Sequence, residues 1–329
     1  MNSWTPDRVL ELSRAFMESR ILLTGVELDV FTLLCDSPKS LDEVASVLKT
    51  SARGTAILLD ALTMMGLLSK VDGRYVCPKE TAKVLSADSP ETVLPMLRHA
   101  AGLWSRWSQL TEIVREGTVK RPPEVFQEPL ELEAFIGAMH VIGKHLAGSI
   151  AERCKAEASR SLLDVGGATG TYAEAFLRHY PAMRATVFDR PPVIEFARKR
   201  LAQTDLMARI TLAAGDFYAD ELPGGHDLVL LSAIIHQNSA ELNVELYRKV
   251  FRALVPGGRI LIRDHVMNAD RIQPCGGALF AVNMLVATAS GNCYTFDEIR
   301  DTLAAAGFTS IRLIQSGDAM DGIIDAFRR

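Results

Sequence analysis

The chain has 329 residues, of which 48% are hydrophobic and 23% charged, and its formal net charge is −4. This composition is typical of a globular protein with room for two domains of roughly 100–200 residues each, and it disfavours a nucleic-acid-binding surface. No apolar run approaches the ~18 residues of a membrane span, and we predict no signal peptide. The five cysteines show no Cys-x-x-Cys spacing, so we expect reduced thiols in the cytoplasm, without zinc or disulfides.

The first ninety residues predict a winged helix. Thr5-Pro6 predicts the start of a helix, and apolar residues follow at helical spacing from Val9 to Leu22. Ser40-Leu-Asp-Glu43 is a capping box that opens another helix. A further helix over 52–65 ends at Gly66, and Asp72-Gly73 between two short apolar runs predicts a β-hairpin. The helix over 52–65 carries a single basic residue, whereas DNA binding needs several on one face. We therefore favour a packing and dimerisation module.

We predict that residues 91–155 form a helical linker. Two helices are predicted, over 93–116 and 132–155, with Arg121-Pro122-Pro123 between them. His140 and His145 are five residues apart, off the spacing that would pair them on one helix face, so we predict no metal site here.

From Ser161 onward strands alternate with helices, which predicts a parallel sheet covered on both faces. The predicted strands are 161–165, 185–189, 210–214, 226–233, 259–264, 310–315 and 322–327. Pro256-Gly257-Gly258 is predicted to be the turn before the fifth strand, and either Asn238 or Ser239 to cap the helix that follows the fourth.

A glycine-rich turn follows the first of these strands, in the motif Asp164-Val-Gly-Gly-Ala-Thr-Gly170. Gly166, Gly167 and Gly170 leave the backbone open to a ligand, at a junction whose N–H groups point towards it. The carboxylate of Asp164 would repel a pyrophosphate but attract a cation. The motif therefore favours S-adenosylmethionine, which carries an ammonium and a sulfonium, over a dinucleotide.

Polar side chains also follow the other strands, and the carboxyl ends of parallel strands meet at one edge of a sheet. Asp189 is placed to accept hydrogen bonds from ribose hydroxyls, and Asp216 with Phe217 to flank an adenine. His236 and Asp264 follow the fourth and fifth strands. Together these residues predict a nucleoside site with a histidine beside it.

The chain resembles the small-molecule O-methyltransferases of the plant caffeate and animal acetylserotonin type, which have many bacterial relatives. The resemblance covers nearly the whole chain and rests on Gly25-Val-Glu-Leu-Asp-Val-Phe31, the Asp164–Gly170 motif, Gly215-Asp216-Phe217, the histidine after the fourth strand, and Phe296 with Ala305-Ala306-Gly307-Phe308. It implies a winged-helix dimerisation domain over 1–90 and a helical linker over 91–155 that contributes to the substrate pocket. It further implies a Rossmann-like catalytic domain over 156–329, whose seven-stranded sheet has an antiparallel last strand.

The same resemblance implies a homodimer that uses S-adenosylmethionine without a metal, releases S-adenosylhomocysteine and binds neither nucleic acid nor membrane. His236 falls on the family's catalytic base and Asp264 on the acid that orients it. A phenol titrates near pH 10, so a base must remove its proton during transfer. The implied cofactor-binding residues are Asp164, Gly166, Gly167, Gly170, Asp189, Asp216, Phe217 and Ser232. The implied substrate-pocket residues are Met139, Phe280, Asn283, Met284 and Cys293.

Three positions depart from the family pattern. His236-Gln237-Asn238 replaces the common His-Asp-Trp, Ser232 stands where plant members have a cofactor-contacting lysine, and Cys293 stands at a second glutamate beside the histidine. We predict methyl transfer to a hydroxyl of a mostly apolar, aromatic small molecule. These departures leave open N- or C-methylation, or a use of the cofactor other than methylation.

Two alternatives from other classes are disfavoured. A cofactor-sensing winged-helix regulator would need more basic residues in its second helix, and an NAD-dependent dehydrogenase would not place Asp164 before a Gly-Gly-x-x-Gly turn.

Overall fold

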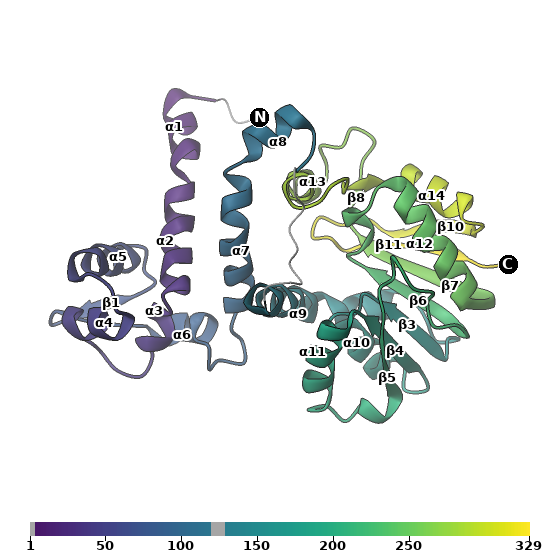
Figure 1. Cartoon of the computed structure of the whole chain (residues 1–329), viewed down its shortest axis with the longest axis horizontal. Coiled ribbons are helices and arrows are strands. Elements are labelled where there is room, and N and C mark those ends of the chain that lie inside the picture. The colour runs from purple at the N-terminus through teal and green to yellow at the C-terminus, as the bar shows by residue number, and fades with distance from the viewer. Residues whose placement is uncertain (1–3, 120–128) are drawn as a thin grey trace. The chain divides into compact units, whose positions relative to one another are not determined.

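The computed structural model describes residues 4–119 and 129–329, which Figure 1 shows as ribbons. The chain divides into two compact units. An N-terminal unit comprises Met1–Trp104 and Glu133–Ala138, and a C-terminal unit comprises Ser105–Leu132 and Met139–Arg329. Across the described ranges, no helix combines the length and apolar character needed to cross a membrane.

The N-terminal unit is a helical module with one short hairpin. Its elements are α1 (Pro6–Arg14), α2 (Phe16–Glu27), α3 (Val30–Leu33), α4 (Leu41–Leu48), α5 (Ala52–Met64), β1 (Ser69–Val71), β2 (Arg74–Val76), α6 (Lys79–Leu85) and the start of α7 (Leu94–Trp107). The predicted capping box is present, with the side chain of Ser40 accepting from the Glu43 N–H and that of Glu43 from the Ser40 N–H. Asp72 and Gly73 both have positive φ, as a tight β1–β2 turn requires.

The helix predicted from Thr5-Pro6 starts as expected, with Thr5 accepting from the Arg8 N–H, but it is interrupted at Ala15. The chain forms two helices that meet at Ala15, whose N–H bonds the carbonyl of Leu12, three residues back instead of four. The helix predicted over 93–116 is also two helices, α7 and α8 (Leu110–Glu116), because Gln109 leaves the helical conformation with ψ near 4°. The predicted break at 121–123 lies outside the described residues.

The C-terminal unit is built on the predicted seven-stranded sheet. Its elements after α8 are α9 (Pro129–Arg153), which passes through both units, β3 (Ser161–Val165), α10 (Thr171–His179), β4 (Arg184–Asp189), α11 (Pro191–Leu201), η1 (Met207–Arg209), β5 (Ile210–Ala214), β6 (His226–Ser232), η2 (Ile235–Gln237), α12 (Ala240–Ala253), β7 (Leu254–Asp264), β8 (Val266–Met267), α13 (Cys275–Ala287), β9 (Tyr294–Thr295), α14 (Phe296–Ala305), β10 (Thr309–Gln315) and β11 (Gly322–Phe327). The strand order is β10-β11-β7-β6-β3-β4-β5, and β11 runs antiparallel to both of its neighbours. This arrangement confirms the predicted fold class.

The predicted turn at 256–258 lies inside β7 instead of before it. Gly257 donates its N–H to the carbonyl of Arg328, and Arg328 donates its N–H to the carbonyl of Gly258. Pairing with the end of the chain therefore extends the strand back to Leu254, although Gly257 keeps a positive φ. Ser239, one of the two predicted caps, accepts the hydrogen bond from Leu242 N–H at the start of α12.

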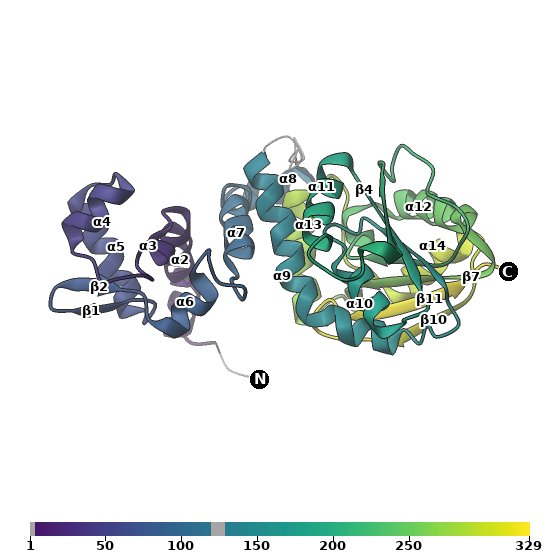
Figure 2. The same ribbon diagram turned by 90° about the horizontal axis from the view of Figure 1, so that it is seen from below.

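Helices cover both faces of the sheet (Figure 2), and the side chains of the two faces enter two separate cores. Residues of α12 and α14 pack on one face, and residues of α9, α10 and α11 pack on the other. Because the central strands are buried on both sides, consecutive side chains at the carboxyl end of one strand point into different surroundings. This alternation separates the polar groups of the site described next.

Candidate functional site

The glycine turn after β3 leaves no room for side chains. Gly166 and Gly170 have φ values of 66° and 73°, which favour glycine. A Cβ atom on Gly167 would lie 2.9 Å from the carboxyl group of Asp164, and one on Gly166 would lie 2.5 Å from Cδ1 of Ile234. The turn is therefore a bare stretch of backbone at the carboxyl edge of the sheet.

Asp164 holds the helix that follows this turn. Its side chain is 1% exposed, and Oδ2 accepts a hydrogen bond from the Ala173 N–H in the first turn of α10, at 3.2 Å. Burial raises the pKa of Asp164 to about 7, against the opposing effect of that hydrogen bond. This contact was not predicted from the sequence.

Asp189, at the end of β4, ties the glycine turn to the neighbouring strand. Its Oδ2 accepts from the Ala168 N–H at 2.9 Å and its Oδ1 from the Arg190 N–H at 2.7 Å. Burial raises the pKa of Asp189 to about 6 despite these two bonds. Each carboxylate oxygen keeps a further acceptor site for a ligand hydroxyl.

Asp216 and Phe217 follow β5 and lie close to the turn. Asp216 Oδ1 accepts from the Tyr218 N–H at 2.9 Å. A Cβ on Gly166 would be 3.6 Å from Cε1 of Phe217, so the ring borders the same stretch of backbone. The structure thus brings together the ends of β3, β4 and β5.

A buried histidine–carboxylate pair lies at the ends of β6 and β7. Nδ1 of His236 is 2.9 Å from both Oδ1 and Oδ2 of Asp264, whose oxygen Oδ1 also accepts from the His265 N–H at 2.8 Å. Burial acts to raise the pKa of Asp264, but His236, the hydrogen bond from the His265 N–H and the charge of Arg263 together outweigh it, and the pKa is lowered. The arrangement therefore favours a charged carboxylate on Nδ1 of the imidazole.

The ring of Phe280 in α13 packs edge-on against the imidazole of His236, with the ring centres 4.8 Å apart. The 291–293 loop packs against the same residue, because the Asn292 N–H donates to the His236 carbonyl at 2.8 Å. Burial raises the pKa of Cys293 in this loop to about 12, so its thiol stays protonated.

The remaining predicted pocket residues are distributed more widely. Asn283 accepts a hydrogen bond from Nε1 of Trp107 at 3.1 Å, and Met284 is buried in α13. Met139 lies half-buried on α9, and the contacts found among the described residues do not bring it to His236.

Comparisons with known proteins show the family of this chain. A model of the O-methyltransferase domain matches residues 125–309, and a model of the O-methyltransferase dimerisation domain matches residues 10–86. The chain belongs to the O-methyltransferase family. It is an S-adenosylmethionine-dependent enzyme.

Two curated relatives and one solved structure illustrate the likeness of this O-methyltransferase to known proteins. It is 32% identical to the tetracenomycin polyketide synthesis 8-O-methyl transferase of Streptomyces glaucescens, over 93% of this chain and 92% of the relative. It is also 32% identical to the 3-hydroxy-5-methyl-1-naphthoate 3-O-methyltransferase of Streptomyces sahachiroi, over 94% of this chain and 91% of that relative. The structure of human N-acetylserotonin methyltransferase in complex with S-adenosylmethionine superposes with a TM-score of 0.85, at 26% identity over 100% of this chain and 99% of that one.

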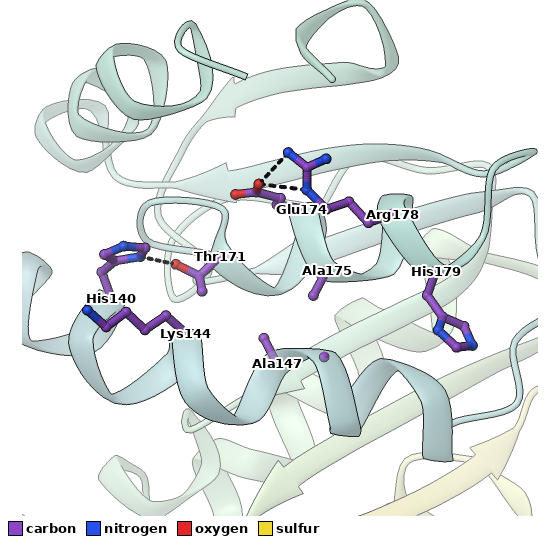
Figure 3. Close-up of a pocket in the computed structure, with 9 residues that line it drawn as sticks. His140, Lys144, Ala147, Thr171, Glu174, Ala175, Arg178 and His179 are labelled. Atoms are coloured by element: carbon purple, nitrogen blue, oxygen red, sulfur yellow. Dashed lines mark hydrogen bonds and ion pairs between the residues drawn. The ribbon is translucent and has the colours of Figure 1, made fainter. Parts of the chain in front are cut away.

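The O-methyltransferase also has an open pocket of about 450 Å³ between α9 and α10 (Figure 3). It is lined by His140, Lys144, Ala147, Gly148, Thr171, Glu174, Ala175, Arg178 and His179. Nδ1 of His140 lies 2.8 Å from the Thr171 hydroxyl, and Glu174 pairs with both Arg178 and Arg200. The His236–Asp264 pair does not line this pocket, so we place the chemistry at the strand ends and not here. Within the described ranges, no three His, Cys, Asp or Glu side chains are grouped as metal ligands would be.

Two polar residues beside Asp264 were missed from the sequence. Arg263 and His265 are both buried, and Nε and Nη2 of Arg263 and Nδ1 of His265 have no hydrogen-bond partner among the described residues. The signal was present in Ile262-Arg-Asp-His-Val266, where three polar residues interrupt an apolar strand. Only the structure shows which of these three faces His236.

Proposed function

We propose that this O-methyltransferase methylates a hydroxyl group of an aromatic, mostly apolar small molecule, with His236 as the general base. The observation that carries the proposal is the pair of 2.9 Å contacts from Nδ1 of His236 to the carboxylate of Asp264. With Nδ1–H donating to that carboxylate, Nε2 is left with a free lone pair. The names of the relatives support the acceptor class, since one is named for a hydroxylated naphthoate and another for N-acetylserotonin.

The cofactor is assigned to the glycine turn and the strand ends around it. At Gly166, Gly167 and Gly170 a Cβ would collide with neighbouring side chains of the protein, so the backbone of this turn depends on glycine. Asp189 offers its remaining acceptor sites to ribose hydroxyls, and Asp216 and Phe217 border the adenine. Asp164 and Ser232 are also assigned to the cofactor site. Asp164 contributes to it by maintaining the turn as well as by its charge. When bound, S-adenosylmethionine supplies a methyl group on a positively charged sulfur.

The chain's own contribution to transfer is to move one proton. Nε2 of His236 accepts the proton from the acceptor hydroxyl as the oxygen attacks the methyl carbon. Asp264 stabilises the imidazolium that results, because its lowered pKa keeps it charged throughout. Phe280 holds the imidazole plane from one side, and the neutral thiol of Cys293 adds no second charge to the pair. Phe280, Asn283, Met284 and Met139 are assigned to the acceptor pocket.

We further propose that the protein is a homodimer joined through its N-terminal unit, in keeping with the dimerisation-domain match. Large apolar side chains that would be covered in a dimer are exposed along α1 and α2: Val9, Leu10, Leu12, Phe16 and Met17. Light scattering of the full chain tests this state. The domain division at residues 90 and 155 and the cytoplasmic location stay predictions.

Incubation with methyl-labelled S-adenosylmethionine tests the proposed reaction. The acceptors are a panel of phenols and naphthols, each with its amine counterpart. We expect label on oxygen for the unmodified protein and a loss of roughly 10²–10⁴-fold in His236→Gln, the range that general base catalysis contributes. Cofactor affinity should change little, which separates loss of the base from loss of the fold. A His236→Gln variant with the original rate, or label found mainly on nitrogen, would overturn the proposal.

A further inference from the structure

Among the described residues, Arg263 is a buried cation without an ion-pair partner, although its charge contributes to the lowered pKa of Asp264. Its side chain is 3% exposed, and neither Nε nor Nη2 has a hydrogen-bond partner in the part of the chain that the structure describes. Nη1 makes a long contact of 3.5 Å to the hydroxyl of Ser232, its pairing neighbour on β6. A guanidinium stays charged at any pH a protein tolerates, so burial of these donors is unfavourable until an acceptor reaches them.

The nearby carboxylates of the strand ends are already engaged. Asp264 follows Arg263 in β7 and therefore points to the opposite face of the sheet, where it holds His236. Asp164 bonds the N–H of Ala173. Another arginine of β7 shows the contrast: Arg259 lies 3.5 Å from Asp325 and donates to the Cys154 carbonyl at 2.7 Å.

The free donors of Arg263 have the geometry that a carboxylate matches. Nε–H and Nη2–H project in parallel from one edge of the planar guanidinium, which is the fork that binds both carboxylate oxygens at once. The hydroxyl of Tyr172 is also buried and has no hydrogen-bond partner among the described residues, and the centre of the Tyr172 ring lies 5.4 Å from the Arg263 guanidinium carbon. Burial raises the pKa of Tyr172, so this hydroxyl keeps its proton and remains a donor, although Arg263 and Ser232 act in the opposite direction.

These groups belong to the edge of the sheet where the cofactor is assigned. Tyr172 is the second residue of α10 and follows the glycine turn by two positions. Ser232 ends β6, and the next residue, Ala233, has a positive φ as the chain leaves the sheet. Tyr172 is half-buried, so part of its side chain remains accessible at this edge.

We propose that Arg263 and Tyr172 form a carboxylate-binding site at the carboxyl edge of the sheet, beside the glycine turn. The carboxylate is either the methionine carboxylate of S-adenosylmethionine or one carried by the acceptor. The acceptor alternative rests on the proposed function, whereas the cofactor alternative needs only the cofactor. The site's chemistry is the same in both cases: two parallel N–H donors from Arg263 and one O–H from Tyr172.

Calorimetric titration without turnover tests the site with ligand pairs that differ in one carboxylate. S-adenosylmethionine is compared with its decarboxylated analogue. In the presence of S-adenosylhomocysteine, 3-hydroxybenzoate is compared with 3-hydroxybenzamide. We expect the unmodified protein to prefer the carboxylate member of one pair by about 10- to 100-fold, as a charge-assisted bidentate contact provides. The pair that is discriminated identifies the source of the carboxylate.

The variants then assign the preference to residues. Arg263→Gln should abolish it, Tyr172→Phe should reduce it by about 3- to 10-fold, and Arg259→Gln, the matched control in the same strand, should leave it intact. Equal affinity for both members of each pair in the unmodified protein overturns the proposal without any variant. Full preference retained by Arg263→Gln overturns it as well. These titrations measure binding without methyl transfer. If His236 were not the base, neither of the two contradicting results would follow.

Discussion

Replacing Asp264 with asparagine removes a charge from the partner of His236 while changing the side-chain volume very little. The carboxylate accepts from Nδ1–H of His236 through both oxygens at 2.9 Å and is 1% exposed. An amide can turn its NH₂ group towards Nδ1, which would move the imidazole proton to Nε2 and leave no lone pair for the acceptor hydroxyl. An amide also cannot stabilise the imidazolium by charge.

The expected loss follows from the charge interaction. Two unit charges about 4 Å apart interact by about 4 kcal/mol at an effective dielectric constant of ~20, and each 1.36 kcal/mol is tenfold in rate. Part of this energy is recovered by relaxation, so we expect kcat to fall by roughly 10²–10³-fold. S-adenosylhomocysteine affinity should remain within a few-fold, because the cofactor is assigned to the ends of β3, β4 and β5.

The assay is single-turnover methyl transfer on a verified acceptor, with calorimetric titration of S-adenosylhomocysteine alongside. The matched control is Asp325→Asn, which neutralises another fully buried carboxylate, on β11, that pairs with Arg259 and Arg312. It should lower stability but preserve the rate of transfer. A transfer rate in Asp264→Asn within threefold of the original would refute the reasoning.

Two further predictions concern the glycine turn. Gly167→Ala would place a Cβ 2.9 Å from both the Asp164 carboxyl and Cγ1 of Val187, so unfolding in urea should show a loss of about 1–3 kcal/mol, together with weakened cofactor binding. Gly148→Ala, where a helical Cβ would meet nothing within 4 Å, is its control and should be neutral or stabilising; equal losses in both would contradict the packing argument. Because burial raises the pKa of Asp164 to about 7, the folded protein binds a proton more tightly than the unfolded chain, and stability without cofactor should fall as pH rises from about 4 to about 7. In urea unfolding, Asp164→Asn should reduce that fall in stability by roughly 2 kcal/mol between pH 5 and pH 7. The smaller pH dependence that arises from Asp189 should remain. An unchanged slope of the unfolding free energy against pH would exclude Asp164 as its source.

Much of the fold could be predicted because its signals are local. Apolar runs separated by turn residues predicted all seven strands of the sheet, and the capping box at Ser40 and the Asp72-Gly73 turn formed as expected. The predicted element boundaries were wrong where tertiary contacts outweighed a local pattern, or where the local pattern contained no sign of the change. Gly257 would end a strand in isolation, but hydrogen bonds with Arg328 extend β7 through it. The interruption at Ala15 follows a change in backbone hydrogen bonding that helical spacing cannot report.

The candidate site was predictable in position but not in orientation. Parallel strands place their carboxyl ends at one edge, so the order of strands and helices alone placed Asp164, Asp189, His236 and Asp264 there. The contact between His236 and Asp264 joins residues 28 positions apart, and it depends on the register of β6 against β7.

The sequence by itself determined the α/β architecture, the glycine turn and the family, because these depend on spacing along the chain. The tertiary structure decided what each charged group faces. Asp164 caps α10, Asp264 holds His236, and Arg263, one residue before Asp264, points to the other face and keeps unsatisfied donors. The reason is physical: side chains alternate across a sheet, and only the packing on each face determines which partners they meet.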